Sequence, residues 1–302
     1  FIIYMEKVLS EEEDNTIVSA EQIKLDHIVK HYVTDVEHRD NLIIIANFVE
    51  GSWKNGSKEC YFFTLHNHEH ARYLIYRLHE IFERTGFSIY LNSKEAFRLF
   101  AACFLHDIGM LSEPAKYRLY DIREDDIQNL QDEVNQILQV AVARDPDDIK
   151  LDLQQIYEIF SNVERVRESI VRNEHPNISE KELVGDFPEL PLSVAERRDI
   201  GIISVAHGWN KDKVKNITDD LHDGRHPIHL RLLSLLLRIA DLSDVSKERI
   251  RREVLERNHH RMSTTSVFHW IKHLSVDKLT IEHRESENGI TNIIFTIHHN
   301  YL

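Results

Sequence analysis

The residues with the clearest potential for chemistry are the adjacent pair His106 and Asp107, at the end of the apolar segment FRLFAACFLHDIGM. Apolar residues recur there at helical spacing, so the segment is predicted to be a buried helix. Both polar side chains must then be hydrogen-bonded, ion-paired or metal-bound, because an unsatisfied buried polar group costs about 2–7 kcal/mol. Neighbouring side chains on a helix point about 100° apart. One of the pair can therefore bind a metal ion while the other bridges or orients.

Further histidines and a carboxylate occupy comparable places, each at the edge of a predicted apolar element: His66, His70, His175, His207 and Asp241. His66 and His70 are four residues apart and face the same side of one predicted helix. Asp241 follows the run LLSLLLRIA, where a carboxylate is costly unless it is paired or bound to a cation. These segments are predicted to present their polar residues to one interior site.

Imidazole with carboxylate suits Mn, Fe, Co or Zn better than Mg, which prefers oxygen ligands and retained water. Four histidines and two aspartates are enough for two ions, with Asp107 as the natural bridge. Two ions about 3.5–4 Å apart activate water and stabilise both oxygens of an in-line displacement at phosphorus. The alternatives are ordinary: a lone histidine is more often a hydrogen-bonded core residue, and Asp241 could pair with Arg238. A second dyad, His222-Asp223, has no apolar helix before it and is not expected to be a ligand.

FLHDIGM, with HEHARYLI upstream and LRIADLSD downstream, resembles the HD superfamily of metal-dependent phosphohydrolases, named for the His-Asp dyad. The resemblance covers residues 62–245. It implies four core ligands, and two more that its two-metal members use: His70, His106, Asp107 and Asp241, then His175 and His207. Thr64-x-His66-x-x-x-His70 and Arg172-x-x-His175 are similar to HD enzymes joined to Hsp90-type ATPase modules. The chain itself contains no P-loop pattern.

The expected function is hydrolysis of a phosphate ester, either a phosphomonoester or a phosphodiester, by a metal-activated water. A nucleotide or nucleotide-derived molecule is the expected substrate. Asp107 would bridge and orient the metals, and His66 would protonate the leaving oxygen. Arg72, Lys116 and Arg172 are candidates for phosphate contact, because each is close in sequence to a predicted ligand.

Two other kinds of protein remain open: a dinuclear-iron HD-type oxygenase, and a catalytically silent HD module that binds partners or regulates. A nuclease is disfavoured by the net charge of −14, which repels nucleic acid unless the basic stretch 247–261 lines the site. No apolar run approaches the ~20 residues that span a bilayer. With no secretory signal visible and only Cys60 and Cys103 for disulfide formation, a cytoplasmic location is expected.

The predicted fold is mainly α: an HD-domain helical bundle with an acidic helical insertion and a C-terminal β-hairpin. Its expected parts are an N-terminal arm and helices, the HD domain, the insertion inside that domain, and a C-terminal helix and hairpin, at residues 1–60, 61–250, 112–172 and 251–302. The chain begins with Phe1 rather than Met, so it is expected to be a fragment or to carry extra residues.

Local signals place several of these elements. Asn92 and Ser193 are predicted to cap helices that end at Gly109 and near His207, because each precedes an acidic residue in the first turn. The region 173–192 holds prolines and is predicted to be loop-rich, and the apolar stretch 229–244 is predicted to be the central helix. The hairpin must pack on the helical body, contact a further domain or mediate a homo-oligomer, since a lone hairpin is marginal.

Overall fold

The computed structural model describes residues 20–55, 68–111, 153–185, 190–218, 221–223, 226–245, 249–285 and 291–299, with short pieces between 128 and 139. These residues are mostly helical and end in a two-stranded antiparallel sheet, which confirms the predicted fold class. The α-helices are α1 (Ala20–Tyr32), α2 (Val36–Asn55), α3 (His68–Thr85), α4 (Ser93–Leu105), α7 (Leu153–Gly185), α8 (Val194–Val205), α9 (Lys211–Lys215), α10 (Leu230–Ser243), α11 (Arg252–Asn258) and α12 (Thr264–Ser275). The 3-10 turns are η1 (Phe87–Tyr90), η2 (Ile108–Leu111), η3 (Ala206–Gly208) and η5 (His259–Arg261). The strands are β1 (Leu221–Asp223), β2 (His226–Ile228), β3 (Val276–Glu285) and β4 (Thr291–His299).

Helix α4 is the centre of the bundle. All of its side chains from Glu95 to Leu105 are buried, and a capping box between Asn92 and Glu95 fixes where the helix begins. Helices α2, α3, α8 and α10 pack around it. Because α4 is enclosed along its length, the two residues that follow it, His106 and Asp107, are held in the interior.

The prediction that residues 229–244 form the central helix was wrong. Helix α10 buries one face against α3, α4 and α8, but Leu235 and Leu242 are 43% and 64% exposed. A folded protein retains much apolar surface, so a run of leucines does not by itself require burial on every side. The residue that matters for the site, Asp241, lies in the last turn of this helix.

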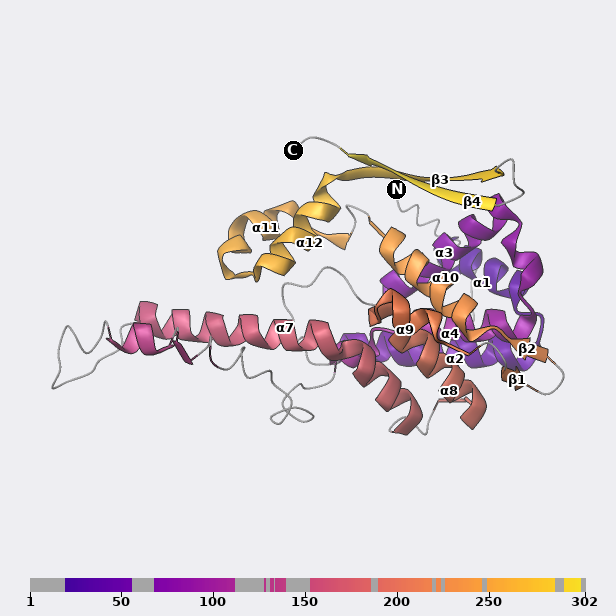
Figure 1. The fold of residues 1–302 in the computed structure, drawn as a ribbon, viewed down its shortest axis with the longest axis horizontal. Helices are drawn as coiled ribbons and strands as arrows, with labels where there is room; N and C mark the ends of the chain where they lie inside the picture. The colour runs from indigo at the N-terminus through magenta and orange to yellow at the C-terminus, as the bar shows by residue number, and fades with distance from the viewer. Residues whose placement is uncertain are drawn as a thin grey trace, which may run out of the picture.

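The prediction of a loop-rich region at 173–192 was also wrong for its first part, because α7 continues through it to Gly185 and contains Pro176. A proline inside a helix removes one donor, the one that would bond to the carbonyl four residues earlier. Here that carbonyl belongs to Arg172, and it accepts a hydrogen bond from the imidazole of His175 instead (2.9 Å). The proline is tolerated because a side chain replaces the missing backbone donor. Figure 1 shows α7 running from the bundle far beyond it.

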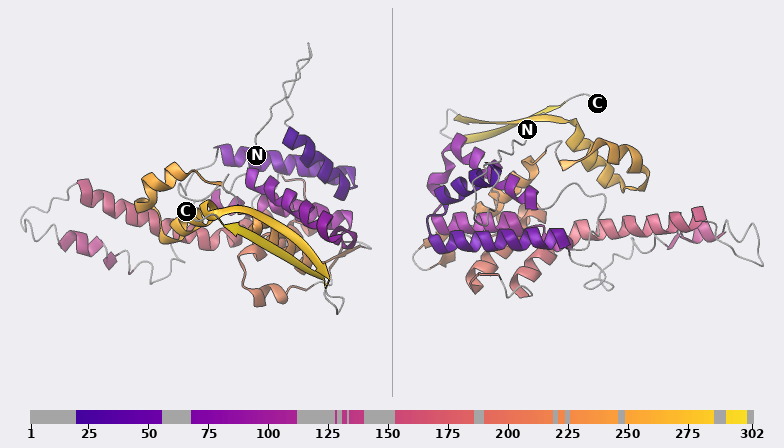
Figure 2. Two further views of the ribbon diagram at one scale, coloured as in Figure 1. Left: turned by 90° about the horizontal axis from the view of Figure 1, so that it is seen from above. Right: turned by 180° about the vertical axis from the view of Figure 1, so that it is seen from behind.

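The C-terminal hairpin packs on the helical body, which is one of the three arrangements expected for it. Strands β3 and β4 pair in antiparallel register, with Ile281 opposite Phe295. Ile281 is fully buried, and β3 contacts α3. The hairpin curves across the bundle in the two views of Figure 2. In the part of the chain that the structure describes, no helix is both long enough and apolar enough to cross a membrane.

A second, smaller apolar cluster lies within the segment that precedes the hairpin. It contains Ile250, Met262 and Trp270, from the region of α11 and α12. Ser263 and Ser266 of this segment donate hydrogen bonds to Glu168, which is buried on α7. Helix α12 is therefore tied to the long helix that carries His175.

A buried ion pair links the central helix to α8. The Nε atom of Arg98 donates to Oδ2 of Asp199 at 2.9 Å, and the two side chains are 0% and 2% exposed. Taking both charges out of water is expensive, so the buried guanidinium of Arg98 depends on Asp199 for its stability, while Asp199 also accepts from Arg198. This pair fixes α4 against the helix that leads to His207.

We expect Asp199→Ala to lower the free energy of unfolding by about 3–5 kcal/mol, because it removes the carboxylate beside a buried guanidinium. Denaturant unfolding measures the effect. The control is Glu256→Ala, which removes one partner of an exposed pair with Arg252 (65% and 62% exposed) and should cost less than about 1 kcal/mol. Equal effects of the two substitutions would contradict the structural role of the buried pair.

Candidate metal centre

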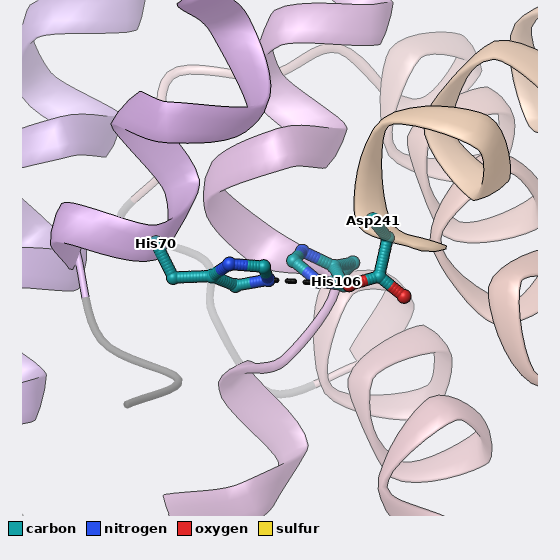
Figure 3. Close-up of side chains that lie close together, drawn as sticks. All are labelled: His70, His106 and Asp241. Atoms are coloured by element: carbon teal, nitrogen blue, oxygen red, sulfur yellow. Dashed lines mark ion pairs between the residues drawn. The ribbon is translucent and has the colours of Figure 1, made fainter. Parts of the chain in front are cut away.

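The six predicted ligands meet at one place in the bundle. They form two groups whose ligand atoms lie within 4.8 Å of one another: His70, His106 and Asp241 in the first, and Asp107, His175 and His207 in the second. Figure 3 shows the first group, where side chains from α3, the end of α4 and α10 point toward one another. Each group combines imidazole with carboxylate, so either could hold a divalent transition metal ion.

The carboxylate of Asp107 faces both groups. Its Oδ2 atom is 3.1 Å from His106 Nε2 and 3.7 Å from His70 Nε2. Its Oδ1 atom is 3.3 Å from His175 Nε2 and 3.8 Å from His207 Nε2. One oxygen is thus directed to each group, which is the arrangement expected of a bridging carboxylate.

Three of the histidines are oriented by helix ends or breaks. His106, His175 and His207 each donate from Nδ1 to the carbonyl three residues earlier, on Cys103, Arg172 and Ser204. Carbonyls in the last turn of a helix lack an intrahelical donor, and Pro176 frees the carbonyl of Arg172 in the same way. Since a carbonyl can only accept, Nδ1 must carry the hydrogen, and Nε2 of each neutral ring is left with its lone pair.

His70 is oriented by a carboxylate instead of a carbonyl. Its Nδ1 atom is 2.6 Å from Oδ2 of Asp244, and its Nε2 atom is 3.3 Å from Oδ1 of Asp241. A carboxylate behind a metal-binding imidazole sets its tautomer and raises its basicity. Asp244 is itself buried and lies 3.3 Å from the guanidinium of Arg249.

The close approach of two imidazole nitrogens indicates a cation at the second group. Nε2 of His175 and Nε2 of His207 are 2.9 Å apart, while both Nδ1 atoms donate to carbonyls. Burial and the neighbouring His106 and His175 lower the pKa of His207 to about 4, so that ring is neutral near pH 7. Two lone pairs at this distance repel unless a proton or a metal ion lies between them. A metal with bonds of about 2.0–2.1 Å to both nitrogens separates them by about 3 Å, so these residues fit a bound metal.

In the first group, burial and the charges of neighbouring side chains shift the pKa values in opposite directions. Burial alone would lower the pKa of His106, but Asp107 and Asp241 raise it to about 8. Burial alone would raise the pKa of the Asp241 carboxyl, but His70 and the other histidines hold it well below its usual range. The Asp241 carboxylate is therefore ionised at neutral pH and available to a cation.

The comparisons with known proteins agree with this arrangement. A family model described as HD-CE matches residues 60–300. The chain belongs to the HD-CE family. Searches of curated proteins and of solved structures found no match.

The other predicted site residues of this HD-CE domain are His66, Lys116, Arg72 and Arg172. His66 and Lys116 lie outside the described residues. Arg72 forms ion pairs with Glu69 and Glu50 at 3.2 and 3.6 Å, and Arg172 donates to Ser266 and lies 3.7 Å from Glu168. Roles of these residues in phosphate contact or proton transfer stay predictions.

The two alternatives raised for aspartates have different outcomes. Asp241 does not depend on Arg238, whose guanidinium donates to the carbonyls of Ala206 and Trp209. The second dyad, His222-Asp223, belongs to the short hairpin of β1 and β2 rather than to a helix end.

Two residues that support the HD-CE centre were missed in the sequence. Asp244 orients His70. Ser179 accepts from the backbone N–H of Gly109 and donates to the carbonyl of His106, which ties the turn after α4 to α7. The sequence signal for Asp244 was its place three residues after Asp241, one helical turn further on. Ser179 gave no signal, because its role exists only where α7 meets η2.

Gly109 permits that contact. A Cβ atom there would lie 2.4 Å from the carbonyl oxygen of His175 and 2.7 Å from the backbone nitrogen of Ser179. Backbone cannot give way as a flexible side chain can. The glycine is therefore required for the turn that follows the His-Asp dyad to approach the helix that carries His175.

We expect Gly109→Ala to destabilise the fold by about 1–3 kcal/mol, as overpacking does, and to weaken metal binding by displacing His175. Thermal unfolding and metal titration measure the two effects. Gly51→Ala is the control, since Gly51 lies in α2 with open space around its Cβ position. This substitution should raise the free energy of unfolding by about 0.5–1 kcal/mol. A stable Gly109→Ala protein with normal metal binding would contradict the packing argument.

We expect Asp244→Ala to lower metal affinity about 10- to 100-fold, because His70 loses the acceptor that orients its ring. Competition with a chelator of known affinity measures the change. Asp244→Asn keeps an oxygen that can accept from Nδ1 and should retain more of the affinity. If both variants bind metal like the unmodified chain, Asp244 does not orient a ligand.

Proposed function

We propose that this HD-CE chain is a metal-dependent hydrolase that cleaves a phosphate ester, with a nucleotide or nucleotide-derived molecule as substrate. The observation that carries the proposal is the position of Asp107, with one carboxylate oxygen toward each of two histidine-rich groups. Membership of the HD-CE family supports a metal-dependent hydrolase. The nucleotide substrate rests on the resemblance to HD phosphohydrolases.

Two divalent transition metal ions are proposed as cofactors, drawn from Mn, Fe, Co and Zn. His70, His106 and Asp241 would hold one, His175 and His207 the other, and Asp107 would contact both. Bound there, such ions lower the pKa of a water molecule and stabilise negative charge that develops at phosphorus. The other contributions to catalysis come from the side chains and backbone of the protein.

The chain contributes positioning. Backbone carbonyls and Asp244 hold the imidazole rings with Nε2 inward, so no reorganisation of ligands is needed when substrate arrives. The burial of His70, His106 and Asp107, with side chains 1–7% exposed, excludes bulk water and strengthens each electrostatic contact. His66 is proposed to donate a proton to the leaving oxygen.

The likeness to HD enzymes joined to Hsp90-type ATPase modules stays a proposal about a partner domain. Direct measurements distinguish the dinuclear-iron oxygenase and the catalytically silent module from a phosphohydrolase. Oxygen consumption by the iron-loaded protein would favour the oxygenase. Tight metal binding without turnover of any phosphate ester would favour the silent module.

We expect Asp107→Ala to abolish hydrolysis of phosphate esters and to reduce the metal content from about two equivalents per chain to one or none, because it removes a ligand to both sites. Elemental analysis of protein purified without chelator measures the metal. A panel of nucleotide and non-nucleotide phosphate esters measures turnover.

The matched control is Asp223→Ala, which removes the aspartate of the other His-Asp dyad and should change neither quantity. Circular dichroism shows whether each variant is folded. Full activity and metal content in folded Asp107→Ala protein would disprove the site assignment.

A further inference from the structure

Asp241 has the most exposed side chain of the six predicted ligands. The side chains of His70, His106, Asp107, His175 and His207 are 1–10% exposed, whereas that of Asp241 is 27% exposed. We call the side at Asp241 the open side, because it is the side of the centre most accessible to a ligand. The groups that surround this residue decide what kind of ligand can enter.

Basic side chains gather on that side, although the chain as a whole carries a net charge of −14. The charges of Arg172, Lys272 and Arg249 act on His269, as does that of Asp241. Lys272 interacts in the same way with Asp241, Arg249 and Asp244. Four basic groups from α7, α12 and the segment before α11 thus share the neighbourhood of one exposed ligand.

Two of the four already have carboxylate partners. Arg172 lies 3.7 Å from Glu168, and Arg249 lies 3.3 Å from Asp244. Among the described residues, no carboxylate forms an ion pair with the ammonium of Lys272 or the ring of His269. Both side chains are half-buried, and burial lowers the pKa of each. The pKa of His269 falls to about 4, so its ring is neutral near pH 7 and can donate one N–H to a ligand. The half-buried ammonium of Lys272 has no carboxylate of the described residues at ion-pair distance, which is costly, and an anionic ligand would offset that cost.

The position of these two residues is fixed by the fold. His269 and Lys272 are three apart on α12 and so lie on one face of it. That helix is held to α7 by Ser266, which donates to Glu168 and accepts from Arg172, and its neighbour Trp270 is buried in the apolar cluster. Both groups are therefore presented by a fixed helix, which suits a binding site.

We propose that Lys272 and His269 on α12 bind the phosphate group of the ligand on the open side of the metal centre. This inference rests on the proposed function, and it names the residues that hold the anion. Lysine offers a compact charge with three donors, which matches the non-bridging oxygens of a phosphate. Helix α12 then forms a wall of the substrate site, outside the metal ligands themselves.

Binding of inorganic phosphate to the manganese-loaded full chain tests the proposal, measured by titration calorimetry. We expect Lys272→Gln to weaken binding about tenfold or more, because a charge-assisted hydrogen bond is lost. His269→Gln should weaken it less, and Lys272→Arg should retain most of the affinity. The matched control is Lys278→Gln, at an exposed lysine on β3, which should bind phosphate normally. Manganese content should be unchanged in all four variants.

Three results would overturn the inference: normal phosphate binding by Lys272→Gln, no phosphate binding by the unmodified chain, or a loss of manganese in Lys272→Gln that accounts for its weaker binding. The last would show that Lys272 serves the metal centre rather than the ligand. Failure of the proposed function is distinguishable. A chain that binds phosphate through Lys272 but hydrolyses no ester would have the anion site without the activity.

Discussion

The structure of the centre depends on one constraint: four imidazole rings must direct Nε2 inward while Nδ1 is satisfied elsewhere. In three of them the acceptor is a backbone carbonyl that a helix end or a proline has freed. The same hydrogen bond thus satisfies a buried carbonyl and fixes the tautomer of the imidazole ring. Asp107 can face both groups only because this set of rings surrounds it.

The bundle around the centre holds these helix ends in fixed positions relative to one another. Helix α4 is enclosed on all sides, and its buried Arg98 is bound to Asp199 on the helix that leads to His207. Ser179 joins the turn after the His-Asp dyad to α7. Each link runs between elements that carry different ligands, so a shift of any one helix would move a ligand relative to the others.

The net negative charge of the chain and the basic side chains near Asp241 act on an approaching anion at different distances. A net charge of −14 repels polyanions at a distance, whereas Lys272 offers positive charge close to Asp241. Such an arrangement favours a small anion over an extended nucleic acid. The segment 249–275 also reaches the ligand shell through Arg249 and Asp244, so the C-terminal part of the chain takes part in the centre.

The sequence by itself determined the helical class, the C-terminal hairpin and the residues that meet at the centre. Ligand types at the ends of apolar helices are a local signal, because burial makes an unsatisfied polar group costly wherever the chain places it. The tertiary structure decided which oxygen of Asp107 faces which histidines, and it brought in Asp244, Ser179, Lys272 and His269. It also decided that α7 continues past Pro176 and that α4, not α10, is central. These features depend on contacts between segments far apart in the chain, and neither periodicity nor residue type reports such distances.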